Sequence, residues 1–219
     1  MEAGTLYLDG MVLRGHSYAL KKGNFDKLNV LEINGTEFVE NTYPFQIIAV
    51  SNVDLKDSLL MNNRDVMSVT RVSSFSVFQT VFLNNTYYLS ISDSGTIIDD
   101  SYFELHQTNA NAGALSVSSG NCQIRKTLFD SNSGNKAGAI YTSNSAMLSI
   151  QDTSFVNNKG DAGGIFCNNA AGNIFNSEFT GNQGQKAGAV YCERNCQLFF
   201  QDTHFENNEP EWSNPSCQP

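Results

Sequence analysis

The chain has 219 residues, a formal net charge of −9 and only 16% charged residues. Its 13 basic residues are scattered, which argues against nucleic acid as a partner, because binding to phosphates requires clustered lysine and arginine. No apolar run approaches the roughly 20 residues of a membrane-spanning helix, so insertion into a membrane is not expected.

Residues 1–30 precede a repeat that begins at residue 31. They lack the basic start and the continuous apolar core of a signal peptide. The chain therefore either stays inside the cell or is a processed or excised piece of a longer protein. Residues 11–21 fit the repeat poorly, with His16 in place of a hydroxyl residue and Lys21 in place of asparagine. We expect 1–30 to be an N-terminal cap or a degenerate first rung.

Residues 31–208 contain eight copies of one pattern, apolar-x-apolar-x-x-Ser/Thr-x-Phe-x-x-Asn, at intervals of 21 to 26 residues. The phenylalanine position is filled by Phe38, Leu60, Phe82, Phe103, Phe129, Phe155, Phe179 and Phe205. The asparagine position is filled by Asn41, Asn63, Asn85, Asn132, Asn158, Asn182 and Asn208, with His106 as the exception. A fixed period of this length is typical of stacked structural units.

Each copy predicts strands rather than helices, since apolar residues alternate with period two and no face of period 3.6 persists. A second short apolar strand follows each asparagine, for example at 66–69, 88–91 and 189–192. Two or three short strands in each unit, separated by polar turns, describe one rung of a parallel β-helix. We therefore predict an all-β fold, a right-handed parallel β-helix (solenoid) of about eight to nine rungs.

Stacking would turn the repeated positions into structural ladders. The phenylalanine and aliphatic positions fill the interior, and each asparagine lies at a corner, where its amide bonds the turn backbone and the next asparagine. The Ser/Thr column is expected to cap turns or to form a hydroxyl ladder. Gly-Ala pairs such as Gly113-Ala114 and Gly138-Ala139 mark places where the backbone bends or approaches another strand closely.

Residues 209–219 break the pattern with Pro210, Trp212 and Pro215. Proline cannot donate to a strand ladder, so the regular rungs are expected to end here. This segment is either a C-terminal tail or cap, or the place where a longer protein was cut.

The combination of Phe-x-x-Asn with Gly-Gly-Ala-[Ile/Leu/Val] resembles the repeats of chlamydial polymorphic membrane proteins and of related protist surface proteins with right-handed β-helix regions. The first motif covers 38–208, whereas the second covers only 113–115, 138–140, 163–165 and 188–190. The resemblance implies an extracellular β-helical passenger or ectodomain, often adhesive, without a cofactor.

An enzyme is the competing class, because right-handed β-helices also carry polysaccharide lyases and glycoside hydrolases. Asp57, Asp100, Asp152 and Asp202 occupy every second rung of one column, roughly 10 Å apart and close to the separation of glycosidase carboxylates. The Gln-Asp-Thr at 151–153 and 201–203 is similar to a pectinesterase tripeptide, but both copies fall in the same repeat columns. That placement favours a structural interpretation, and we predict no catalytic residues.

No metal site is predicted, because His16, His106 and His204 occupy different columns. At position 106 an imidazole can supply hydrogen bonds like those of asparagine. Cys167 and Cys192 share one column, whose strand spacing exceeds the Cβ separation that a disulfide prefers. A ladder of buried thiols is the favoured interpretation there, and a strained disulfide between the two is the alternative.

Two further features point to the surface. If Ile140, Ile165 and Val190 face inward, then Tyr141, Phe166 and Tyr191 form an outer aromatic strip suited to sugar rings or a partner protein. With the opposite parity these three aromatics belong to the core. The sequons at Asn34 and Asn84 permit N-glycosylation in a eukaryotic secretory route.

These observations favour a non-catalytic structural and adhesive protein that is extracellular or on the cell surface. Its expected partners are other copies of itself or a cell-surface protein or glycan, and no cofactor is expected. The alternative within this class is a subunit of a self-assembling extracellular filament, which the low charge and stackable rungs permit. A polysaccharide lyase or glycoside hydrolase is the third hypothesis.

Overall fold

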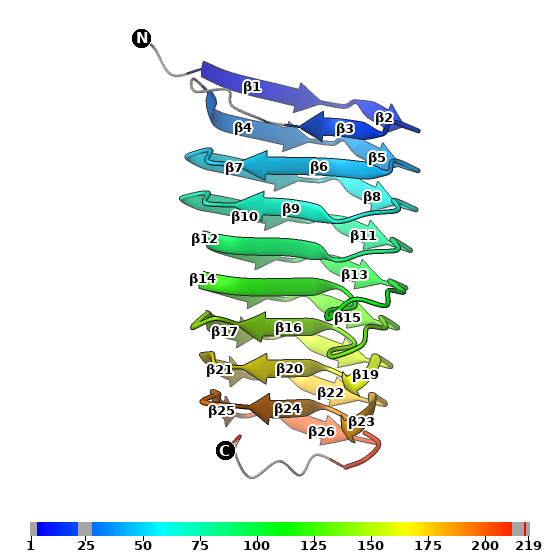
Figure 1. The fold of residues 1–219 in the computed structure, drawn as a ribbon, viewed down its shortest axis with the longest axis vertical. Coiled ribbons are helices and arrows are strands. Elements are labelled where there is room, and N and C mark those ends of the chain that lie inside the picture. Colours follow the sequence, from blue (N-terminus) through cyan, green and yellow to red (C-terminus); the bar gives the residue numbers. More distant parts are fainter. Residues whose placement is uncertain (1–3, 22–27, 212–216, 218–219) are drawn as a thin grey trace.

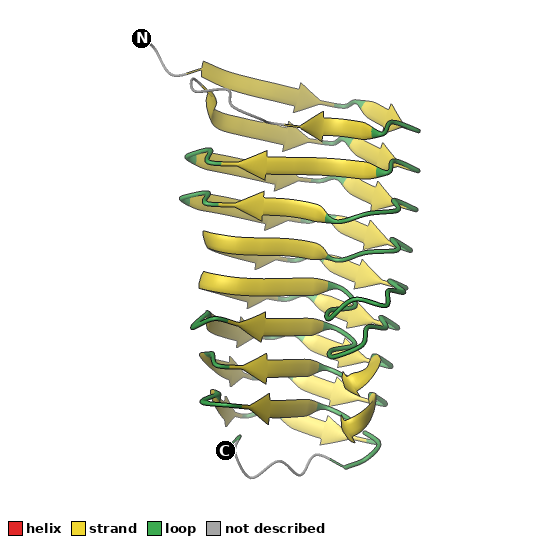
Figure 2. Cartoon of the chain, in the orientation of Figure 1, coloured by secondary structure: helices red, strands yellow, loops and turns green. Residues whose placement is uncertain are grey.

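The computed structural model describes residues 4–21, 28–211 and 217, and it contains strands and turns but no helix in these ranges (Figure 2). The described residues therefore include no helix that could cross a membrane. In Figure 1 the chain runs left to right along the far side and returns along the near side while it descends from the N-terminus. This winding is right-handed, as crossovers between parallel strands usually are. The predicted all-β parallel solenoid is confirmed.

Each turn of the solenoid contributes one strand to each of three faces in succession. The first face consists of β1 (Gly4–Asp9), β4 (Leu28–Asn34), β7 (Asn52–Lys56), β10 (Ser74–Phe78), the later halves of β12 (Leu89–Asp99) and β14 (Leu115–Arg125), β17 (Met147–Gln151), β21 (Ala171–Phe175) and β25 (Gln197–Gln201). The second face consists of β2 (Val12–Arg14), β5 (Glu37–Val39), β8 (Leu59–Met61), β11 (Val81–Leu83), β13 (Tyr102–Glu104), β15 (Leu128–Asp130), β18 (Ser154–Val156), β22 (Glu178–Thr180) and β26 (His204–Glu206).

The third face returns the chain to the first. It consists of β3 (Tyr18–Lys21), β6 (Tyr43–Ile48), β9 (Met67–Thr70), the earlier halves of β12 and β14, β16 (Ile140–Ser143), β20 (Ile165–Asn168) and β24 (Val190–Glu193). A small sheet of β19 (Lys159–Ala162) and β23 (Gln183–Ala187) lies between the second and third faces. The chain changes direction after each face, and we call these places the first, second and third bends.

All strand pairs are parallel and join equivalent positions of neighbouring rungs. Phe82, for example, is in register with Leu60 on one side and Phe103 on the other. These side chains are fully buried, and the rings of Phe82 and Phe103 stack with centroids 4.3 Å apart. A continuous apolar column therefore runs along the axis of the solenoid, as the repeat predicts.

Each bend is made by a residue in the left-handed backbone conformation, such as Asp57 and Asp100 in the first bend and Asn62 and Asn84 in the second. Aspartate and asparagine tolerate this conformation better than other residues with a side chain. In these rungs polar residues therefore turn the chain, whereas Gly10 and Gly35 do so at the first bend of the N-terminal rungs. Gly113 permits close packing of neighbouring rungs, because a Cβ there would lie 1.8 Å from the carbonyl oxygen of Gly138 in the next rung.

The first rung differs in register from the sequence prediction. Leu13 of β2 pairs with Phe38, so Leu13 occupies the phenylalanine column. His16 therefore occupies the asparagine column instead of the hydroxyl column, and its backbone N–H donates to Oδ1 of Asn41 over 2.9 Å. The pairing of β2 with β5 therefore sets a register five residues earlier than the one expected for 11–21.

At the C-terminal end the chain continues past the last regular rung. The N–H of Gly188 donates to the carbonyl oxygen of Pro210 over 2.8 Å. Cys217 is buried against the main core. Trp212 and Pro215, which the sequence assigns to a tail or cap, lie outside the described residues.

Candidate functional site

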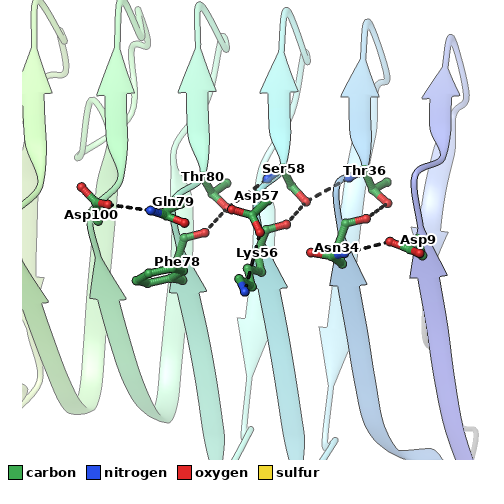
Figure 3. A network of polar contacts seen from close by, with 10 residues as sticks. All are labelled: Asp9, Asn34, Thr36, Lys56, Asp57, Ser58, Phe78, Gln79, Thr80 and Asp100. Atoms are coloured by element: carbon green, nitrogen blue, oxygen red, sulfur yellow. Dashed lines mark hydrogen bonds and ion pairs between the residues drawn. The ribbon is translucent and has the colours of Figure 1, made fainter.

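The hydroxyl column lies at the first bend and forms a ladder along the solenoid (Figure 3). The Ser58 hydroxyl donates to the carbonyl oxygen of Lys56 over 2.7 Å and accepts the backbone N–H of Thr36 from the neighbouring rung over 3.2 Å. Thr80 repeats this arrangement one rung further on. The column thus both caps its own turn and bridges to the next, and its side chains are buried from Thr36 to Ser177.

The asparagine column lies at the second bend and is also buried. The Nδ2 group of Asn158 donates to the Phe129 carbonyl oxygen over 2.9 Å and to Oδ1 of Asn182 over 3.0 Å. Its Oδ1 accepts the backbone N–H and the Nδ2 group of Asn132, both over 3.0 Å. The amides therefore satisfy backbone groups that a buried corner would otherwise leave without partners.

His106 occupies this column in one rung and supplies part of the same bonding. Its backbone N–H donates to Oδ1 of Asn132, and its Nε2 lies 3.2 Å from the Phe82 carbonyl oxygen, where other rungs place Nδ2. The imidazole offers no oxygen to Asn85, whose Nδ2 is 3.5 Å from Nε2. Burial lowers the pKa of His106 to about 4, so the ring is neutral at neutral pH.

The carboxylates at the first bend point outward rather than toward one another. Gln79 donates to Asp100 over 3.0 Å, and Asn176 donates to Asp152, so the amide of the intervening rung bonds the neighbouring carboxylate. Asp57 pairs instead with Lys56 at 3.7 Å. Asp100 and Asp152 are thus each held by an amide of a neighbouring rung, which agrees with the structural interpretation that the position of the Gln-Asp-Thr triplets favours.

The cysteines do not pair as the sequence suggests. Cys167 and Cys192 are in register in neighbouring strands, but each forms a disulfide with another residue: Cys167 with Cys196, and Cys192 with Cys217. Both the thiol ladder and the direct disulfide between Cys167 and Cys192 are therefore wrong. Cys196 follows the third bend and Cys217 lies beyond the repeats, so each disulfide connects one rung to the next segment of chain.

These cysteines also account for the one group of metal-type ligands found among the described residues. The sulfur atoms of Cys167, Cys192 and Cys196 all lie within 4.8 Å of one another. Their sulfurs are bonded in disulfides, and a disulfide sulfur lacks the thiolate that binds a metal ion. Cys122 keeps its thiol and is buried, which raises its pKa to about 12.

The aromatic strip differs from the prediction at its centre. Ile140, Ile165 and Val190 face the main core, as predicted. Tyr141 and Tyr191 are half-buried, but Phe166 between them is 0% exposed. The expectation of an exposed row of three rings is therefore wrong.

The chain at the second bend covers Phe166. Lys136 and Lys186 place their ammonium groups 5.0 Å and 5.3 Å from the centre of the ring. Both lysines also contact Asp161, at 3.9 Å and 3.2 Å. Period-two alternation predicts the direction of a side chain, but it does not predict that a neighbouring loop folds over that face.

These loops also form a groove that the sequence analysis did not predict. Two hollows of about 680 Å³ and 450 Å³ share Ser133 and Lys159, and together we call them the second-bend groove. The groove runs along the solenoid, and one wall consists of the residue that directly follows the asparagine column in each rung. These residues are Thr86, Gln107, Ser133, Lys159, Gln183 and Glu209. Each of these residues donates its N–H to the carbonyl oxygen of the ladder residue one rung earlier. The groove wall is therefore fixed by backbone bonds.

A signal for the groove is present in the spacing of the repeats. Successive residues of the phenylalanine column lie 21 or 22 residues apart as far as Phe103, and 24 to 26 residues apart beyond it. The additional residues fall between the asparagine and the strand of the third face. They build the projecting loops at the second bend.

Both sequon asparagines are exposed. Asn34 ends β4 on the first face and donates to Asp9 over 2.8 Å, and Asn84 lies in the second bend and donates to Asn62 over 2.8 Å. Each side chain thus reaches the surface of the rod.

Comparison of the chain with protein-family models, curated proteins and solved structures finds no match. Function is therefore inferred from the contacts within the chain itself.

Proposed function

We propose that this protein is a non-catalytic, extracellular or cell-surface rod that binds its partners through its sides. The observation that carries the proposal is the pair of disulfides, Cys167–Cys196 and Cys192–Cys217. Disulfides that join structural elements persist in oxidising compartments and are rare in the cytosol. The exposed sequons at Asn34 and Asn84 fit the same location.

The non-catalytic part of the proposal rests on the polar columns. The buried hydroxyl and asparagine columns bond the bends from rung to rung, and the outer carboxylates accept hydrogen bonds from amides. These columns therefore have structural partners. The second-bend groove adds a polar surface whose exposed side chains are not used in these columns, and this favours binding over chemistry.

The proposal is tested by the binding of fluorescently labelled, oxidised protein to intact cells, measured by flow cytometry. We expect saturable binding that excess unlabelled protein displaces. Protein that has been reduced, alkylated and unfolded serves as the control, because it keeps the composition but loses the rungs. Binding that does not saturate, or that the unfolded control reproduces, would contradict an adhesive function.

A filament subunit is the second candidate, and one observation favours it. The first rung exposes large apolar side chains, with Tyr7 64% exposed, Val12 59% and Tyr18 45%. Strands β1 and β2 pair on one side only within the described residues. An apolar edge of this kind can accept a strand from another copy.

A further inference from the structure

The second-bend groove contains exposed polar side chains that have no hydrogen-bond partner within the described part of the chain. At the first bend Gln79 donates to Asp100, and at the second bend Asn84 donates to Asn62. In the groove, the side chains of Gln107, Gln183 and Gln185 are exposed and make no hydrogen bond to any residue that the structure describes. Each of these amides offers donors and an acceptor to a ligand.

The period of the groove restricts the kind of ligand. Its wall advances one residue for each rung, and parallel strands lie about 4.8 Å apart, so five steps from Thr86 to Glu209 span about 24 Å. A pyranose residue in an extended chain advances by a length close to one rung. An oligosaccharide of about five residues would therefore meet one polar side chain for each sugar over this length.

The charge of the groove adds a preference. Lys159 lines both hollows and is exposed, and its ammonium forms no ion pair within the described part of the chain. Glu209, the acidic residue of the wall, lies at the C-terminal end. At the opposite end Tyr87 is half-buried and can offer a ring face to a sugar. The middle of the groove is thus suited to a carboxylate or sulfate group.

From this geometry we infer that the second-bend groove binds an extended acidic oligosaccharide parallel to the solenoid axis, with an anionic group at Lys159. The inference rests on the proposed surface-binding function and names its ligand class. The amides of Gln107 and Gln183 bond sugar hydroxyls on either side of Lys159.

The test is isothermal titration calorimetry of the full chain with three hexasaccharides: a neutral β-1,4-glucan, a polyuronate and a sulfated glycosaminoglycan. We expect the two acidic ligands to bind at least tenfold more tightly than the neutral one. Lys159→Ala should weaken the binding of the acidic ligands at least tenfold, whereas Lys56→Ala, on the first face, should leave it unchanged. Gln107→Ala/Gln183→Ala should weaken all binding relative to the matched control Gln123→Ala/Gln197→Ala.

Two results would overturn the inference: no heat of binding with any of the three ligands, or undiminished affinity in the Lys159→Ala chain. Cell binding by the labelled protein separates this failure from that of the proposed function. If cell binding survives both groove variants, the protein is adhesive through another surface and only the inference fails. If the hexasaccharides bind but cells do not, the groove is correct and the adhesive function fails.

Discussion

In most rungs one buried asparagine connects its own bend to the bends of both neighbouring rungs. Asn158 receives the backbone N–H of Asn132 and donates to the Phe129 carbonyl oxygen and to Asn182. Because the side chain is 0% exposed, water cannot replace these bonds when the amide is removed. The column thus links local turn structure to the stability of the whole stack.

We expect Asn158→Ala to lower the free energy of unfolding by about 2–4 kcal/mol, since it leaves several buried backbone groups unpaired. Urea denaturation measures the change. Asn173→Ala is the matched control, because Asn173 is exposed on β21 and should change stability by less than about 0.5 kcal/mol. Equal effects of the two substitutions would show that the ladder does not stabilise the fold.

His106 makes stability depend on pH. Burial lowers its pKa to about 4, below the ordinary value of 6.5, so between these values the unfolded chain binds a proton that the folded chain does not. Stability from this residue is therefore complete above pH 6.5 and falls as the pH drops toward 4. The loss over the window should be about 3 kcal/mol.

We expect His106→Asn to remove most of this slope, because asparagine does not titrate and restores an oxygen acceptor for Asn85. Urea midpoints measured at intervals from pH 7 to pH 4 provide the comparison. His204→Asn, at an exposed position on β26, should keep the slope of the wild type. An unchanged slope in His106→Asn would assign the acid sensitivity to other groups.

At the scale of elements, the disulfides connect the last rungs of the stack. They join residues 29 and 25 positions apart, so each closes a loop about one rung long. Loops of this length give a stabilisation of about 3.5 kcal/mol in the chain-entropy account. In a repeat protein each rung contacts only its neighbours, so this stabilisation acts mainly on the C-terminal end.

Reduction should therefore loosen β24–β26 first. Hydrogen exchange measured by mass spectrometry, with and without dithiothreitol, should show faster exchange at 190–206 and little change at 52–83. The N-terminal rungs serve as the internal control in the same sample. Uniform loss of protection along the chain would contradict rung-by-rung stabilisation.

The elements also show how far the sequence predicts this structure. Columns repeated in every rung, such as Phe82 over Phe103, follow from the period, because equivalent residues must stack. Cys196 and Cys217 lie outside the repeated columns, so no period places them beside Cys167 and Cys192. The groove was missed for the same reason, since loops of unequal length fold according to contacts such as those of Lys136 and Lys186 with Phe166.

At the scale of the molecule, the leading proposal requires single rods. We expect light scattering to give one particle mass across a concentration series, and electron microscopy to show short particles of uniform length. Growth of the particles with concentration would favour the filament instead. In that case Tyr7→Asp/Val12→Asp should stop the growth, and Ile97→Asp/Met147→Asp, on exposed positions of the first face, should not.

The central claim is that the protein functions outside the cell, and disulfide mapping tests it most directly. The protein is isolated from its natural source, and its thiols are trapped by alkylation under denaturing conditions. We predict peptides joined by Cys167–Cys196 and by Cys192–Cys217, with Cys122 alkylated. Without denaturant, Cys122 should resist alkylation, because burial raises its pKa to about 12. Recovery of all five cysteines as alkylated thiols would place the protein in a reducing compartment and contradict the proposed surface function.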